Sequence, residues 1–113
     1  MDYLETDRDI DARRIALMRP TAIVVNTARG GLIDLEALYT ALADRRILGA
    51  GLDVFEHEPP DPRHPIFTLD NVAVSNHIGW YSEESMRDLQ RMAAEEAVRV
   101  LQGHPPRHWL NPW

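Results

Sequence analysis

The sequence predicts an α/β fold built on a parallel sheet. Short apolar segments, at residues 22–26, 47–55 and 71–77, alternate with stretches whose apolar residues recur at helical spacing. The first of these segments is apolar on both of its alternating faces, as a strand covered by helices on both sides must be. Because neighbouring parallel strands need a crossover, and the intervening helices supply it, this order favours part of a doubly wound sheet.

A short helix and the first strand begin this order. Asp11 is placed to cap a helix that runs to Met18 with its apolar side chains on one side, and Pro20 prevents its continuation. The first strand follows as AIVVN, residues 22–26. The chain leaves this strand through a single arginine, Arg29, and then two glycines.

The second helix is predicted at residues 35–44. Asp34 precedes it as an N-cap, and Glu36 suits the positive end of the helix dipole. A second buried strand lies within ILGAGLDVF, residues 47–55, whose glycines suggest close packing against a neighbouring backbone or a ligand. The apolar stripe of the helix consists of Leu35, Leu38, Tyr39 and Leu42.

A proline-rich loop, a third strand and a long helix complete the predicted order. Residues 58–65 hold four prolines and are therefore predicted as a loop, and residues 71–77 form the third short strand. Ser82 caps the last helix, Arg99 stands near its end, and Gly103 stops it. Its apolar stripe is predicted to pack into a core and consists of Met86, Leu89, Met92, Ala93, Ala97, Val100 and Leu101.

Three strands are few for a doubly wound sheet, and the covering helices are incomplete. The sequence therefore predicts that residues 1–113 form the C-terminal half of a larger domain, with a long strand edge left to be paired. The missing half, or self-association of the chain, would then complete the sheet. An isolated chain of this kind is expected to associate or aggregate.

Composition excludes several classes of function. The 113 residues are 44% hydrophobic, enough for one small domain with a core, and the net charge is −6. This charge and the scattered basic residues argue against nucleic-acid binding. The absence of cysteine excludes disulfides and thiolate metal sites. Apolar runs are too short to span a membrane and no leader opens the chain, so a soluble, cytoplasmic protein is expected.

Polar side chains follow each predicted strand. In open α/β sheets, ligands bind beyond the carboxyl ends of the strands, so these side chains are expected at one rim. A cation, carboxylates and a histidine placed together indicate an acid–base site with a clamp for an anion. The residues are Asn26, Thr27, Ala28 and Arg29 after the first strand, Asp53, Glu56, His57 and Glu58 after the second, and Asn76 and His77 after the third.

The chemistry of these residue types fits that interpretation. Histidine titrates nearest neutral pH, and a neighbouring carboxylate stabilises its protonated form. The planar fork of an arginine suits a carboxylate ligand, and Gly30 and Gly31 are expected to let the backbone turn so that Arg29 faces the cleft. A metal site built from His57, His77 and the carboxylates has no ligand spacing of a known type.

Each candidate also has an ordinary structural interpretation. Arg29 could pair with Asp34 within its loop, and His77 could be a hydrogen-bonded histidine at a strand end. Glu58 could be a solvated loop carboxylate, like Glu56 two residues before it. Asp53 could cap or brace the turn that follows it.

Three motifs, in order, carry a resemblance to a known family. They are NTARGGLID at residues 26–34, GAGLDVFEHEPP at 49–60 and HPIFTLDNVAVSNHIG at 64–79. Over residues 11–102 the chain resembles the C-terminal half of the Rossmann-type cofactor domain of the NAD-dependent D-2-hydroxyacid dehydrogenases. The resemblance implies an oxidoreductase that transfers hydride between a nicotinamide cofactor, NAD with NADP not excluded, and a small 2-hydroxy or 2-oxo acid.

The resemblance also implies roles for individual residues. Arg29 would bind the substrate carboxylate and polarise its carbonyl, His77 would move the proton, and Glu58 would support the protonated His77. The residues that it places near the nicotinamide end of the cofactor are Thr27, Ala28, Arg29, Asp53, His77, Gly79 and Trp80.

The chain also departs from the family pattern. No strand, GxGxxG turn and acidic residue for the ribose precede Asp11, and no substrate domain is recognised, so activity of this chain alone is not expected. Asn76 stands where many relatives have proline. The run from Trp80 to Ser82 is similar to the C-terminal-binding-protein branch, and a tryptophan there would favour a bulkier 2-oxo acid.

Three hypotheses about the whole protein remain open. The chain is a piece of a conventional dehydrogenase, or one half of a split enzyme whose glycine-rich half is a separate polypeptide, or a non-catalytic interaction protein that keeps the half-domain as a scaffold. For the scaffold hypothesis, replacement of Arg29 and His77 by alanine would leave partner binding unchanged.

Overall fold

A computed structural model describes residues 9–107 of the chain. In the first part lie α1 (Ala12–Ala16), β1 (Ile23–Asn26), α2 (Leu35–Ala43), β2 (Gly49–Leu52) and β3 (Val72–Val74). The last element is α3 (Glu83–Leu101), and two 3-10 turns lie at Gly30–Leu32 and Pro65–Thr68. The chain divides between Gly79 and Trp80 into two compact units, the first with the sheet and the second with α3.

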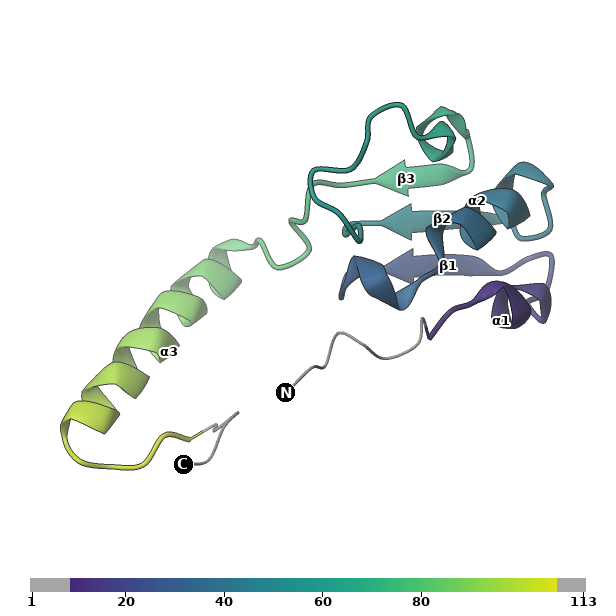
Figure 1. The fold of residues 1–113 in the computed structure, drawn as a ribbon. Coiled ribbons are helices and arrows are strands. Elements are labelled where there is room, and N and C mark those ends of the chain that lie inside the picture. The colour runs from purple at the N-terminus through teal and green to yellow at the C-terminus, as the bar shows by residue number, and fades with distance from the viewer. Residues whose placement is uncertain (1–8, 108–113) are drawn as a thin grey trace. The chain divides into compact units, whose positions relative to one another are not determined.

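The three strands form one parallel sheet in the order β1-β2-β3. Val25 pairs with Gly51, and Gly51 pairs with Ala73, so the strands lie in register along their length. All three arrows point the same way in Figure 1, which brings their carboxyl ends to one edge of the sheet. The predicted α/β class with a parallel sheet and a long C-terminal helix is confirmed.

One face of the sheet carries the core of the first unit. Leu38 and Leu42 stand one turn apart on α2 and are fully buried, because the stripe predicted from their spacing lies against the sheet. Val24 and Leu52 contribute the buried face of β1 and β2. Ile66, from the 3-10 turn before β3, is also fully buried and anchors the proline-rich loop to this core.

The opposite face of β1 is left uncovered in the described chain. Ile23 is 62% exposed and Val25 67% exposed, whereas Val24 and Asn26 between them are buried. The expectation that helices cover both sides of this strand is therefore not met by the described residues. The expectation that the covering layer is incomplete agrees with the same observation.

The predicted helix starts are confirmed by their capping hydrogen bonds. Asp11 accepts from the Arg14 amide at 2.7 Å, and Asp34 accepts from the Ala37 amide at 3.1 Å. In the second unit, the Ser82 hydroxyl accepts from the Ser85 amide at 3.0 Å.

Several predicted ends are shifted. α1 stops at Ala16, because the amides of Leu17 and Met18 bond to carbonyls three residues back and tighten the last turn. α2 ends at Ala43, one residue before the predicted end. The third strand is only Val72–Val74, and residues 75–77 leave the sheet as a loop.

In the second unit, α3 has the predicted start and end. Gly103 has a φ of 82°, the left-handed conformation expected after a helix C-terminus. No residue of α3 is buried, and Leu89 and Met92 are exposed, so the prediction that its stripe packs into a core is wrong for the described chain. Among residues 9–107, no helix is long and apolar enough to cross a membrane.

The first prediction concerns the core. Leu38→Ala should lower the free energy of unfolding by about 2–5 kcal/mol, because it leaves a cavity under the sheet. Leu17→Ala removes the same atoms from an exposed side chain and should change it by less than about 0.5 kcal/mol. Urea unfolding followed by circular dichroism measures both, and equal effects would contradict this core.

The second prediction concerns the uncovered face. Because Ile23 and Val25 expose apolar surface beside an open strand edge, the chain should self-associate as its concentration rises. The double variant Ile23→Thr, Val25→Thr keeps β-branched side chains and should reduce association, whereas Leu17→Thr, at an exposed site outside the sheet, should not. Light scattering over a concentration series tests this, and a strictly monomeric parent chain would refute it.

Candidate active site

The candidate residues gather where the strands end, on the first unit. Residues 27–32 follow β1, residues 53–58 follow β2 and residues 75–79 follow β3. Since the strands are parallel, these three segments leave the same edge of the sheet.

Glu58 and His77 form the central pair. His77 Nδ1 lies 2.7 Å from Glu58 Oε2, and Glu58 Oε1 accepts a hydrogen bond from the Phe55 amide at 3.0 Å. The hydrogen bond from His77, and then that from Phe55, lowers the pKa of Glu58. Because an ionised carboxylate can only accept a hydrogen bond, we assign the donated proton of this pair to Nδ1 of His77. Nε2 is then the ring nitrogen that would exchange a proton with a ligand.

Asp53 is buried, 5% exposed, directly after β2. Its Oδ1 accepts from the Ser75 hydroxyl and from the Ile78 amide, and its Oδ2 accepts from the Gly79 amide at 2.8 Å. The hydrogen bond from Ser75, followed by that from Ile78, lowers the pKa of Asp53. Both oxygens thus bind groups of the same chain, as the interpretation of Asp53 as a brace requires, while its contact with a cofactor stays a prediction.

His77 has a φ of 54°, in the left-handed region that non-glycine residues seldom adopt. Its own amide donates to the Asp53 carbonyl at 2.8 Å. Sequence reasoning missed both this conformation and the part played by Ser75. The only signal in the sequence was a small hydroxyl residue two positions before the histidine.

Asn26 shapes the segment that carries Arg29. Its side chain is buried, donates from Nδ2 to the Arg29 carbonyl at 2.9 Å and accepts at Oδ1 from the Ala28 amide at 3.1 Å. The guanidinium of Arg29 is exposed and donates to the Ala28 carbonyl at 2.7 Å. Asp34, its alternative partner in the sequence, caps α2.

The two glycines after Arg29 do not have the predicted role. Neither Gly30 nor Gly31 has a positive φ, so the turn does not need their conformational freedom. A Cβ at Gly30 would stand 1.9 Å from the Phe55 carbonyl carbon, whereas one at Gly31 would meet nothing within 4 Å. Gly30 is required because the backbone after β1 touches the backbone after β2.

A pocket of about 260 Å³ opens beside the Glu58–His77 pair. It is lined by these two residues and by Asp53, Phe55, Pro59, Pro60, Val74, Ser75 and Asn76. Arg29 is not part of its lining, so the structure brings Asp53, Glu58 and His77 together and places Arg29 at the end of the neighbouring strand.

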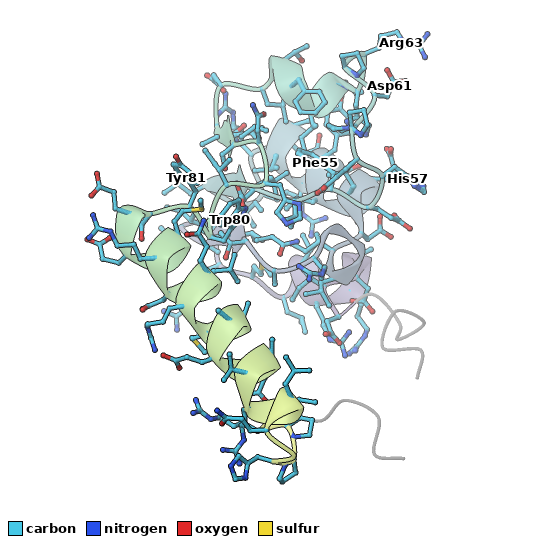
Figure 2. The ribbon with its side chains drawn as sticks, turned by 90° about the vertical axis from the view of Figure 1, so that its left-hand side faces the viewer. Phe55, His57, Asp61, Arg63, Trp80 and Tyr81 are labelled. Carbon is cyan, nitrogen blue, oxygen red and sulfur yellow. The ribbon has the colours of Figure 1, made fainter. Side chains whose placement is uncertain are left out.

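The remaining candidates divide between the two units. Gly79 lies against Asp53 and Thr27: a Cβ there would stand 3.0 Å from Asp53 Oδ2 and 3.5 Å from the Thr27 Cβ. His57 is exposed at the surface of the first unit (Figure 2). Trp80 belongs to the second unit, where its ring meets Tyr81 edge-on with centroids 5.5 Å apart. Within residues 9–107, no group of three histidine or acidic side chains is arranged to hold a metal ion.

Comparisons with known proteins agree with one another. Residues 4–79 match the family described as D-isomer specific 2-hydroxyacid dehydrogenase, NAD binding domain. A D-3-phosphoglycerate dehydrogenase of Methanocaldococcus jannaschii is 45% identical over 107 residues, 95% of this chain and 20% of that protein. A glyoxylate reductase of Thermofilum pendens is 41% identical over 107 residues, 95% of this chain and 32% of that protein.

A solved structure shows the same likeness in three dimensions. The TT0316 protein from Thermus thermophilus superposes with a TM-score of 0.84 at 38% identity, over 95% of this chain and 34% of that chain. The chain thus spans between a fifth and a third of the length of the curated relatives named above.

The third prediction concerns acid stability. The folded state lowers the pKa of Glu58 and Asp53 from ordinary values of 4.5 and 3.8. These two carboxylates therefore contribute fully to the free energy of unfolding when the pH is above their ordinary pKa values. The contribution is lost as the pH falls through their lower pKa values in the folded state. The urea midpoint should fall as the pH drops below 4.5, and Glu58→Gln should flatten that fall. Glu84→Gln, on the exposed surface of α3, should leave it unchanged, and an unaltered slope in Glu58→Gln would contradict the pairing.

Proposed function

Because the chain belongs to the D-isomer specific 2-hydroxyacid dehydrogenase family, through its NAD-binding domain, we propose that it carries the catalytic rim of an NAD(P)-dependent oxidoreductase. The reaction is hydride transfer between a nicotinamide cofactor and a small 2-hydroxy or 2-oxo acid. The observation that carries the proposal is the Glu58–His77 pair, joined at 2.7 Å at the carboxyl edge of a parallel sheet.

His77 is the acid and base of this proposal. When a 2-hydroxy acid is oxidised, Nε2 takes the hydroxyl proton, and when a 2-oxo acid is reduced it returns one. Glu58 stabilises the imidazolium that forms, and the Phe55 amide holds Glu58 toward His77.

Arg29 is the proposed clamp for the substrate carboxylate. Its guanidinium offers a planar pair of donors, and bidentate binding fixes the orientation of the carbon that reacts. The Asn26 side chain donates one hydrogen bond to the Arg29 carbonyl and accepts one from the Ala28 amide, which supports a fixed position for the clamp.

The described residues fit only one end of the cofactor. Gly79 and Thr27 lie side by side at the strand ends and offer a surface with little side-chain bulk, which suits a flat ring. The bound nicotinamide would supply or accept the hydride there. The start of α2 does not offer a phosphate site, because the carboxylate of Asp34 already caps it. We therefore assign to the nicotinamide end the first-unit residues Thr27, Ala28, Arg29, Asp53, His77 and Gly79. The family resemblance alone adds Trp80, which belongs to the second unit.

Residues 1–113 are, in this proposal, the C-terminal half of a dinucleotide-binding domain whose glycine-rich half and substrate domain come from elsewhere. The exposed face of Ile23 and Val25 supports a missing layer, whether that layer is part of the same polypeptide or of a separate one. The names of the relatives, a glyoxylate reductase and a D-3-phosphoglycerate dehydrogenase, support the 2-hydroxy and 2-oxo acid class without selecting one member. The cytoplasmic location stays a prediction.

The fourth prediction tests the catalytic pair in a complete enzyme. The chain is substituted for the matching 107-residue segment of the Thermofilum pendens glyoxylate reductase, and oxidation of NADH or NADPH by glyoxylate is followed by absorbance. His77→Gln should lower kcat by about 10²–10⁴-fold, because the proton then has no donor. His57→Gln, in an exposed position of the same unit, should keep the parent activity.

Two further variants separate the roles of the other residues. Glu58→Gln should lower kcat while Glu56→Gln does not, and Arg29→Lys should raise the KM for glyoxylate by losing the bidentate contact. Full activity of His77→Gln would refute the proposal. If the parent chimera folds and binds cofactor but neither it nor any variant is active, the non-catalytic scaffold hypothesis is favoured instead.

A further inference from the structure

Asp53 has no proton to move in the proposed reaction, yet it is a buried carboxylate at the centre of the rim. It follows β2, the middle strand, and its amide donates to the Asn26 carbonyl at 2.9 Å. Through this bond and its contacts with residues 75–79, Asp53 connects the ends of all three strands. A carboxylate in such a place needs a reason to remain ionised.

That reason is a set of donors from residues 75–79: the Ser75 hydroxyl and two consecutive backbone amides reach the carboxylate, and the preceding amide, that of His77, binds the main-chain carbonyl of Asp53. The N–H of His77 donates to the Asp53 carbonyl at 2.8 Å, that of Ile78 to Oδ1 at 2.9 Å and that of Gly79 to Oδ2 at 2.8 Å. Successive amides converge on one anion when a left-handed residue reverses the direction of the chain. His77, with its φ of 54°, is the left-handed residue here.

The unusual backbone of His77 and the buried charge of Asp53 therefore stabilise each other. A left-handed conformation at a non-glycine residue is unfavourable by itself and persists only where its surroundings determine it. The three hydrogen bonds to Asp53 determine it, and the Ser75 hydroxyl adds a fourth from the preceding residues. The direction of the His77 side chain, and hence its approach to Glu58, follows from that backbone conformation.

We propose that Asp53 is a positioning residue, whose carboxylate holds residues 77–79 in the left-handed turn that sets Nδ1 of His77 against Glu58. Its consequence for catalysis rests on the proposed function, whereas the structural claim does not. Asp53→Asn keeps the size of the side chain but replaces one acceptor oxygen by an N–H donor, which faces amides that also donate. The turn then loses at least one hydrogen bond and gains a repulsion.

The test is nuclear magnetic resonance of the full chain with ¹⁵N-labelled backbone and histidine rings. In Asp53→Asn, the amides of Ile78 and Gly79 should exchange with solvent about tenfold faster or more. The ring ¹⁵N spectrum of His77 should come to resemble that of Glu58→Gln, in which the pair is broken directly. Exchange of the Leu38 and Leu42 amides should stay as in the parent chain, which shows that the core is intact.

Asp70→Asn is the matched control, because Asp70 precedes β3 and pairs with Arg45 at 2.6 Å, away from the turn. It should leave the His77 ring spectrum unchanged. Parent-like exchange of Ile78 and Gly79, or a parent-like His77 ring, in Asp53→Asn would overturn the proposal. If Asp53→Asn does not fold, Ser75→Ala is used instead, because it removes only one hydrogen-bond donor to the Asp53 carboxylate. A smaller change in the Ile78 and Gly79 exchange rates and in the His77 ring spectrum supports the proposal. No change in them overturns it.

Kinetics of the glyoxylate reductase chimera separate positioning from cofactor contact. A positioning role predicts that Asp53→Asn lowers kcat about tenfold or more, and lowers it by a larger factor than it weakens the Kd for NADH, measured by fluorescence. A weaker Kd at an unchanged kcat would overturn it in favour of a cofactor contact. If the parent chimera is inactive, but the amides of Ile78 and Gly79 exchange faster in Asp53→Asn, the proposed function is refuted and the positioning role is supported.

Discussion

Parallel pairing on both sides of β2 is the constraint on which the rest of the first unit depends. It brings three strand ends, and the segments that follow them, to one edge of the sheet. Among residues 9–107, the packing that supports this pairing lies on the buried face of the sheet, where α2 and Ile66 contribute to the core. Apolar packing beneath the sheet thus supports the polar residues at its edge, and Phe55 takes part in both, in the core and in the lining of the pocket.

Buried polar side chains at the edge bind the backbone of the turns that follow the strands. Asn26 uses its side chain on the carbonyl and amide of the following turn, and Asp53 does the same for the turn after β3. Both side chains are buried, and loss of either would remove the hydrogen-bond acceptor of amides in the turn that follows. In the exposed pair, the amide of Phe55 binds the Glu58 carboxylate, and the main-chain carbonyl of Asp53 binds the amide of His77.

The sequence predicts those parts of the structure that local chemistry decides. Asp34 could be predicted as the N-cap of α2, because an aspartate side chain can accept from a free amide in the first turn of a helix. The parallel strands could be predicted because short apolar segments alternate with helical ones. The meeting of Glu58 with His77 follows from the rule that strand ends share an edge. The left-handed His77 could not be predicted, because hydrogen bonds to a residue 24 positions earlier override its local preference. Ile23 and Val25 led to the wrong expectation that both faces of β1 are covered. Their apolar side chains indicate that the strand needs a covering layer, but not that residues 9–107 provide it.

The missing side chain of Gly30 has a mechanical consequence. With no Cβ, the turn after β1 rests directly on the backbone of Phe55 and Glu56, so there is no compressible side chain between the two segments. Any side chain at residue 30 would therefore force these two segments apart. The spacing between the segment that carries Arg29 and the segment that carries Glu58 therefore depends on a direct backbone contact at Gly30.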